Sequence, residues 1–237
     1  MNGEQPRLRE RRDLSAILEA ALALYRLHFA TLIRIAAVTV PLGVAGAALR
    51  ASVDGSVTTE VAAAVLLFLQ YAVDLVVAAA IIAALTDIDA TGGADFSRAY
   101  DVAFERLGSL LGAMARVIVI VVLLFLTIIG IPWSIQRMVR WAFVGQAVIL
   151  DGTSAKDALS TSAAAVEGRW WRTFGAALVI GLIGAAPAGL AAAVFGLGSA
   201  LVSGVAASLV SALLLPFTVT AMTLLYLDLQ VQKAEAA

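Results

Sequence analysis

Long apolar runs recur along the chain and limit its possible folds more than any other feature. A helix needs about 20 mostly apolar residues to cross a membrane. Six segments approach or exceed that length, namely 29–49, 61–85, 107–131, 132–150, 173–195 and 199–227. We therefore expect an all-α polytopic membrane protein with about six transmembrane helices.

The composition agrees with this fold class and excludes a water-soluble protein. Hydrophobic residues make up 62% of the 237 residues and charged residues 14%, whereas soluble domains have about 45–50% and about 25%. The net charge of −1 gives no reason to expect nucleic acid as a partner. With no cysteine and one histidine, the chain excludes thiolate and multi-histidine metal sites.

Three amphipathic segments alternate with the apolar runs. They are 13–27, 95–106 and 154–167, and they begin with Asp13, Asp95 and Ser154 as predicted N-caps. Their apolar residues recur at helical spacing, so we expect three interfacial helices in the membrane plane. This order suggests an internal repeat, in which an interfacial helix and a two-span hairpin are used three times. The alternative is a membrane protein with three unrelated polar segments.

The polar ends and the basic residues predict domain limits and orientation. One membrane-embedded domain is expected over 13–230, between a basic tail at 1–12 and a short tail at 231–237. With six spans both termini share a side, and a cytoplasmic placement leaves only Arg50, Arg137 and Arg140 in the outer half. Since Lys and Arg are enriched on the cytoplasmic side, we expect a bacterial inner-membrane protein with both termini inside.

Charged side chains within two predicted spans are candidates for a functional site. Asp74 lies near the middle of the second span, one helical turn after Gln70. Arg137 and Arg140 lie one turn apart in the fourth. Charges at this depth are costly and need a partner. We expect Asp74 to pair with Arg137 or Arg140, either to fix helix register or to form a substrate or proton site.

Small residues recur at every fourth position of the last two spans. They are Gly181, Ala185, Gly189 and Ala193 in the fifth, and Gly196, Ala200, Gly204, Ser208 and Ala212 in the sixth. Such rows let helix backbones approach closely. We expect the two spans to pack against each other through them; homodimerisation through one row is the alternative.

The strip from 140 to 172 carries short motifs. Asp151-Gly152 ends a span, Ala158-Leu159-Ser160-x-Ser162 begins a helix, and Gly168-Arg169-Trp170-Trp171-Arg172 precedes the next span. With Asp13-Leu14 near the start and Tyr226-Leu227-Asp228-Leu229-Gln230 near the end, this resembles the glycerophosphoryl diester phosphodiesterase membrane domain group and related bacterial integral membrane proteins. The chain departs from the group at Asp151, where Glu is usual, and at Gln230, where Arg is usual. The phosphodiesterase activity belongs to a separate domain with no counterpart here, so the resemblance implies fold and membrane placement only.

The motifs also supply candidates at the inner interface. These are Asp151, Arg169, Trp170, Trp171, Arg172 and Asp228. Carboxylates at span ends and arginines at span starts predict an ion-pair belt between the last three spans. The alternative, which is compatible with the belt, is that Arg169, Trp170, Trp171 and Arg172 bind anionic lipid headgroups.

No catalytic constellation is present in the sequence. Gly-Lys-Ser/Thr does not occur, and the single histidine excludes an H-E-x-x-H site. We expect no cofactor and no metal. The sequence favours a non-enzymatic scaffold or accessory subunit that contacts membrane lipids, another membrane protein or itself. The alternative is a small transporter or lipid-handling protein with a midplane polar site around Asp74 and Arg140.

Overall fold

The computed structural model describes residues 8–52, 56–127 and 130–235, and the elements in this part of the chain are all helical. In order they are α1 (Leu14–Leu27), α2 (Phe29–Ala36), the 3₁₀ turn η1 (Ala37–Thr39), α3 (Val40–Ala51), α4 (Val57–Thr91), α5 (Phe96–Glu105), α6 (Leu107–Phe125), α7 (Gly130–Arg140), α8 (Val144–Leu150), α9 (Ala158–Val166), α10 (Trp170–Gly196) and α11 (Ala200–Ala234). Five segments are long and apolar enough to cross a membrane: Phe29–Ala51, α4, α6, α10 and α11. The prediction of an all-α membrane protein is confirmed.

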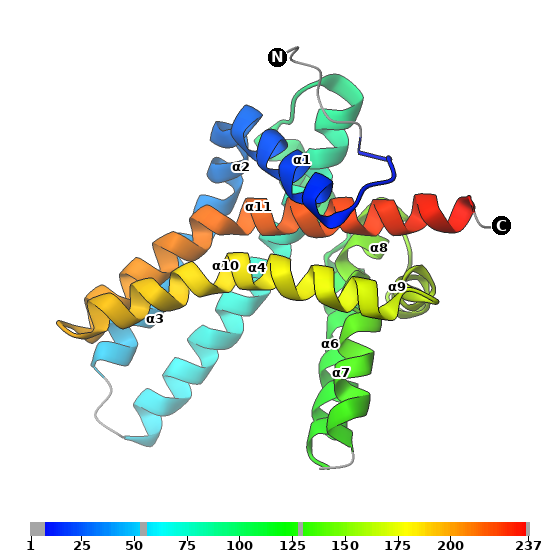
Figure 1. The fold of residues 1–237 in the computed structure, drawn as a ribbon. Coiled ribbons are helices and arrows are strands. Elements are labelled where there is room, and N and C mark those ends of the chain that lie inside the picture. Colours follow the sequence, from blue (N-terminus) through cyan, green and yellow to red (C-terminus); the bar gives the residue numbers. More distant parts are fainter. Residues whose placement is uncertain (1–7, 53–55, 128–129, 236–237) are drawn as a thin grey trace.

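The chain consists of three successive units, each a short helix followed by a helical hairpin. α1 precedes the hairpin of α2–α3 and α4, α5 precedes α6 and α7, and α9 precedes α10 and α11. Figure 1 shows the hairpins radiating from a region that holds α1, α5, α8, α9 and the end of α11. We call this region the base. We call the far ends of the hairpins the tips; they lie next to Ser52 and Ser56, next to Thr127 and Gly130, and at 197–199. The order of elements is the one that the repeat predicts.

Capping side chains determine where the short helices begin. The carboxylates of Asp13 and Asp95 accept hydrogen bonds of 2.8 and 3.0 Å from the backbone N–H three residues on, so both predicted N-caps are confirmed. The bond to the Ala16 N–H, helped by the Ser15 hydroxyl, lowers the pKa of Asp13 below its ordinary value. Ser154 Oγ accepts from the Asp157 N–H (3.3 Å) in a turn just before α9.

A single residue in the bridge region of backbone conformation turns the chain into each hairpin. His28 (φ −110°, ψ 24°) separates α1 from α2, and Arg106 (φ −95°, ψ 2°) separates α5 from α6. Arg169 (φ −130°, ψ 26°) precedes α10. Similar turns at corresponding places support a single supersecondary unit used three times.

The fourth expected span, 132–150, needs a correction, because it is two short helices with a break between them. α7 ends at Arg140 and α8 begins at Val144. In the break, Ser162 of α9 accepts a hydrogen bond from the Phe143 N–H (3.2 Å) and donates one to the Arg140 carbonyl (2.8 Å). A contact from another helix therefore supports the break, and neither α7 nor α8 is among the segments long enough to span alone.

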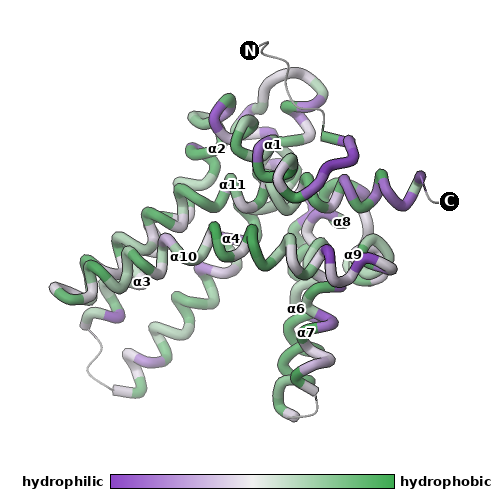
Figure 2. The backbone as a smooth tube through the Cα atoms, viewed as in Figure 1, coloured by the Kyte–Doolittle hydropathy of each residue, from purple (hydrophilic) through white to green (hydrophobic). Residues whose placement is uncertain are grey.

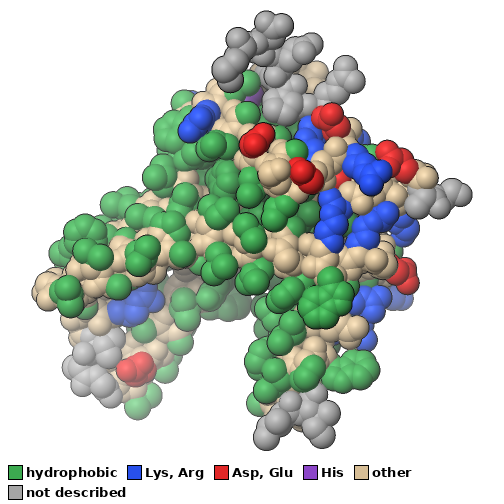
Figure 3. All heavy atoms as spheres, viewed as in Figure 1, with side chains coloured by type: hydrophobic (Ala, Val, Ile, Leu, Met, Phe, Trp, Pro, Cys, Tyr) green, Lys and Arg blue, Asp and Glu red, His purple; other side chains and the backbone are tan. Residues whose placement is uncertain are grey.

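Apolar and polar residues separate along the molecule. Apolar residues follow the hairpins, and polar residues gather towards the base (Figure 2). On the face seen in Figure 3, hydrophobic side chains cover α10 and the α6–α7 hairpin, while most charged side chains lie near the end of α11. This is the distribution expected when the hairpins lie in hydrocarbon and the base lies at the membrane surface.

The hydrophobic core lies at the base, where helices of different units meet. Leu24, Leu85, Phe143 and Tyr226 are among the largest fully buried side chains. They come from α1, α4, the α7–α8 break and α11. The core thus joins the three units at the base rather than at the tips.

Small residues bring α11 close to α3, which corrects the expected packing of the last two spans. A Cβ on Gly204 would lie 2.6 Å from the Cβ of Ala47, and a Cβ on Gly43 would lie 2.7 Å from the hydroxyl of Ser208. Only residues without a side chain allow this approach. Gly204 and Ser208, predicted to face α10, therefore face α3.

The corresponding row on α10 does not pack against α11 as expected. Gly181, Ala185, Gly189 and Ala193 are exposed, and a Cβ on Gly181 or Gly189 would meet no atom within 4 Å. α10 packs along α11 through a neighbouring row instead. In that row Gly184 approaches Thr218, and the carbonyl of Ala192 accepts a hydrogen bond from Ser203 (2.8 Å).

Both described ends of the chain lie at the base. Leu8 and Arg12 are buried, and Arg11 pairs with Glu235 at 3.6 Å. The segment 8–12 therefore packs against the expected domain, and α11 continues past the expected limit at 230 to Ala234.

Candidate functional site

Two of the predicted intramembrane polar residues contact each other. Asp74 lies midway along α4, and Gln70 Nε2 donates a 2.8 Å hydrogen bond to its Oδ1. Both side chains are partly buried. Within the described residues, no Lys, Arg or His nitrogen lies within 4.0 Å of the Asp74 carboxylate. Asp74 is therefore a carboxylate at mid-span without a cationic partner.

The expected pairing of Asp74 with Arg137 or Arg140 is not formed. α7 runs from the tip back to the base, and the Trp170 indole N–H at the start of α10 donates to the Gln136 carbonyl (3.4 Å). The Arg137 guanidinium lies 5.4 Å from the centre of the Trp141 ring. The short length of α7 and the break after it thus place both arginines near the base, whereas Asp74 remains at mid-span.

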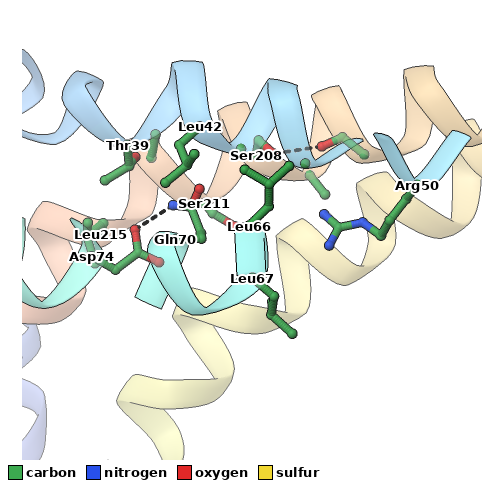
Figure 4. A pocket seen from close by; sticks show the side chains of 15 residues that line it. Thr39, Leu42, Arg50, Leu66, Leu67, Gln70, Asp74, Ser208, Ser211 and Leu215 are labelled. Atoms are coloured by element: carbon green, nitrogen blue, oxygen red, sulfur yellow. Dashed lines mark hydrogen bonds between the residues drawn. The ribbon is translucent and has the colours of Figure 1, made fainter. Parts of the chain in front are cut away.

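A polar cavity of about 250 Å³ lies between α3, α4 and α11 (Figure 4). Its polar side chains are Thr39, Arg50, Gln70, Asp74, Ser208 and Ser211. Its remaining wall consists of leucine side chains and small residues from the same helices. Among the described residues, no cluster of three or more His, Asp or Glu could hold a metal ion. The cavity therefore presents a carboxylate, an amide, a guanidinium and hydroxyls within an otherwise apolar hairpin region.

Two oxygen atoms near Asp74 lack a hydrogen-bond donor. The Gln70 side-chain carbonyl oxygen is buried and accepts no hydrogen bond from the described residues. Among the described residues, the one hydrogen bond to the Asp74 carboxylate reaches Oδ1, which leaves Oδ2 free to accept. Ser208 does not serve either oxygen, because its hydroxyl donates to the Gly204 carbonyl (2.8 Å). A buried acceptor without a donor, such as the Gln70 oxygen, is costly.

Arg50 is the charged residue of this cavity that was not among the predicted site residues. A Cβ on Gly46 would lie 3.5 Å from Arg50 Nη2, so the side chain folds back along α3 to the cavity. No carboxylate of the described residues lies within 4.0 Å of it. Arg50 directly follows the apolar run 29–49, and the sequence places it only in the outer half of the protein. The helical spacing of Gly43, Gly46 and Arg50 was the signal that could have placed it on one face.

Asp228 is at the centre of a second polar cluster, located at the base. Its carboxylate is fully buried and pairs with Arg172 Nη2 at 2.8 Å. It also accepts hydrogen bonds from the Arg12 backbone N–H (2.9 Å) and from Gln232 Nε2 (2.7 Å). Arg172 in turn donates to the Arg12 carbonyl (2.7 Å). This cluster joins the N-terminal segment, α10 and α11, so one pair of the predicted belt is present.

Asp151 has partners other than those the belt predicts. Its carboxylate accepts hydrogen bonds from the Tyr226 hydroxyl and from Gln230 Nε2, at 3.1 Å in the second case. Gln230 stands at the position where the resemblance leads one to expect Arg. The contact that ties the end of α8 to α11 is therefore a set of hydrogen bonds with no ion pair among the described residues.

The two adjacent tryptophans form an aromatic surface at the base. Trp170 stacks on Phe174 at a centroid distance of 5.2 Å, and Trp171 contacts both rings edge-on with 78% of its own surface exposed. Arg169 donates to the Gln232 carbonyl (3.0 Å). Trp171 is thus available to headgroups, whereas Arg169 and Arg172 already serve internal contacts.

Comparison with known proteins gives no relative, because no family model, curated protein or solved structure matches the chain. The resemblance to the glycerophosphoryl diester phosphodiesterase membrane domain group therefore stays a prediction.

Proposed function

We propose that this protein is a non-enzymatic lipid-handling or transport protein that binds a small polar ligand or a lipid headgroup in the cavity between α3, α4 and α11. One observation carries the proposal: in the part of the chain that the structure describes, Asp74 lies in that cavity without a cationic partner, beside a Gln70 oxygen without a donor. Polar groups at mid-span need a partner, because hydrocarbon supplies none. A bound ligand would supply it.

We place the protein in a bacterial inner membrane with its base towards the cytoplasm. The support is the distribution of basic residues. Because α7 returns Arg137 and Arg140 to the base, Arg50 is the one Lys or Arg near the tips in the described residues. An excess of Lys and Arg on one face is typical of the cytoplasmic side.

A substitution that fills the cavity tests the proposal. Gly46 is buried in its wall, and an added Cβ would meet only the flexible end of Arg50, so Gly46→Leu should extend into the cavity. Gly181→Leu is the matched control, since its side chain would enter open space on α10. We expect native mass spectrometry from lipid nanodiscs to show a specifically retained molecule with the wild type and Gly181→Leu. Retention with Gly46→Leu should fall about tenfold or more.

Equal retention in all three proteins would contradict a ligand in this cavity. The folded fraction of each variant is checked by its elution and helical content, so that a loss of ligand is not confused with a loss of fold.

The accessory role predicted from the sequence is the second candidate, and one observation favours it. The row of small residues on α10 from Gly181 to Ala193 faces outward without a partner helix in the described chain. If that row binds another membrane protein, Gly181→Leu should lose a co-purifying protein that Gly46→Leu keeps. The same pair of variants thus separates the two candidate functions.

A further inference from the structure

We propose that the ligand of this cavity is a zwitterion, with an ammonium group bound between Asp74 and Gln70 and a phosphate or carboxylate group bound by Arg50. The inference rests on the proposed function and adds the chemical class of the ligand. It follows from the two charged ends of the cavity and from the room between them.

The Asp74 end of the cavity is suited to a donor-rich cation. Gln70 Nε2 uses one acceptor site at Oδ1, so Oδ2 and the buried Gln70 Oε1 remain as acceptors at this end of the cavity. A primary ammonium carries a positive charge and three N–H donors. It would satisfy both oxygens and neutralise the carboxylate, which neither a neutral donor nor a quaternary ammonium can do.

The Arg50 end is suited to an anion. The guanidinium lies over Gly46, faces the cavity and has no carboxylate partner among the described residues. Its planar set of N–H donors matches the oxygens of phosphate or carboxylate. Arg50 is exposed, so an anion can reach it from the tip side of the hairpin.

The two charges share one cavity without forming an ion pair with each other. Figure 4 shows Arg50 at one end and the Asp74–Gln70 pair at the other, with Leu66 and Ser208 between them. A ligand with a single charge would satisfy one end only, and an anion bound at Arg50 would leave Asp74 at mid-span without a countercharge. A zwitterion satisfies both ends at once.

The size of the cavity limits the ligand to a small group. At about 250 Å³ it is below the range of about 300–1,000 Å³ usual for drug-sized ligands. A phosphoethanolamine group or an amino acid has the required charges and a suitable size. Leu67 lines the cavity and is 45% exposed, so the acyl chains of an intact lipid would have an exit towards hydrocarbon.

The test uses the full-length protein in nanodiscs that contain phosphatidylethanolamine, phosphatidylglycerol and phosphatidylcholine in equal amounts. We expect native mass spectrometry to show that phosphatidylethanolamine is retained about tenfold more than either of the other two lipids. In a second measurement, soluble O-phosphoethanolamine or glycine is added to compete with the bound lipid. Displacement by a soluble compound would identify a free zwitterion as the ligand, and resistance to it would identify the intact lipid. Equal retention of the three lipids, with no binding of either soluble compound, would overturn the inference.

Substitutions at the two ends locate the site. Asp74→Asn and Arg50→Gln should each reduce retention about tenfold, since each removes one charge-assisted contact. Arg50→Lys should restore part of it, and Gly181→Leu should have no effect. Because Arg50 is exposed, its substitution should leave the fold intact. The Arg50 variants therefore still test the inference if Asp74→Asn does not fold. Wild-type retention by both Asp74→Asn and Arg50→Gln would overturn the inference.

The failure of this inference differs from the failure of the proposed function. If an anionic or uncharged molecule is retained and is lost in Gly46→Leu, the cavity binds a ligand and the zwitterion is wrong. If Gly46→Leu retains every bound molecule as the wild type does, both proposals are wrong.

Discussion

The carboxylates of Asp228 and Asp74 differ in how many of their hydrogen-bond partners the protein itself supplies. Asp228 accepts hydrogen bonds from Arg172, Gln232 and the Arg12 backbone, and no part of it is exposed. Asp74 has only Gln70 as a partner in the described chain and faces a cavity. Complete internal pairing indicates a structural role, whereas incomplete pairing beside open space indicates a binding role.

Asp228→Asn should destabilise the protein by about 3 kcal/mol, because the loss of one partner leaves the others of a buried cluster unpaired. This value is at the low end of the range of about 3–5 kcal/mol that breaking a buried ion pair costs, since 35% of the Arg172 side chain is exposed. Denaturant-induced unfolding in detergent micelles measures the change. Glu235→Gln is the control, because its pair with Arg11 is exposed and should change stability by less than about 1 kcal/mol. Similar losses for both variants would show that the buried cluster does not hold the base together.

The sequence predicts Asp74 and Gln70 but not the whole site around them. A polar side chain within a long apolar run is recognisable from the sequence alone, so Asp74 and Gln70 could both be predicted as candidates. Arg50 ends its run and is typical of an interfacial residue, and Ser208 fits a packing row. Only the contact of α3 with α11, which lie far apart in the sequence, brings these residues into one cavity with Asp74.

At the scale of elements, helix starts were predictable where a local side chain caps them. Asp13 and Asp95 cap α1 and α5 as expected, because the donor lies three residues on. The break between α7 and α8 was not predictable from the sequence, because 141–143 contains neither Pro nor Gly. Its stabilising contact comes from Ser162, which is distant in sequence.

Ser162→Ala should therefore destabilise the break between α7 and α8. The variant leaves the buried Phe143 N–H without its acceptor, which costs about 1–3 kcal/mol. Ser160→Ala on the same helix is the matched control, since its exposed hydroxyl only bonds the Asp157 carbonyl and its loss should cost about 0.5 kcal/mol or less. Unfolding measurements compare the two, and hydrogen exchange at 141–144 should rise in Ser162→Ala alone. Equal exchange in both variants would show that the break does not depend on Ser162.

For the molecule as a whole, the three-unit order was visible in the sequence, but the packing of the units was not. Amphipathic segments and apolar runs follow one another along the chain, and they give the order of helices. The packing of one hairpin against another depends on rows of small residues, and these rows have the same spacing and similar composition on different helices. The row with Gly181 faces outward and the row with Gly204 faces α3, and no local property of either row distinguishes them.

The three-hairpin architecture predicts that all tips lie on one side of the membrane and the base lies on the other. Because the chain has no cysteine, single cysteines can report this without background. Thr127→Cys and Ser199→Cys mark two tips, and Ser97→Cys and Ser160→Cys mark the base; all four positions are exposed. In intact cells a membrane-impermeant maleimide should label the two tip variants, and the base variants should react only after permeabilisation. If α7 and α8 together failed to return across the membrane, Thr127 and Ser160 would react from the same side, and the second hairpin would not be a membrane-crossing pair.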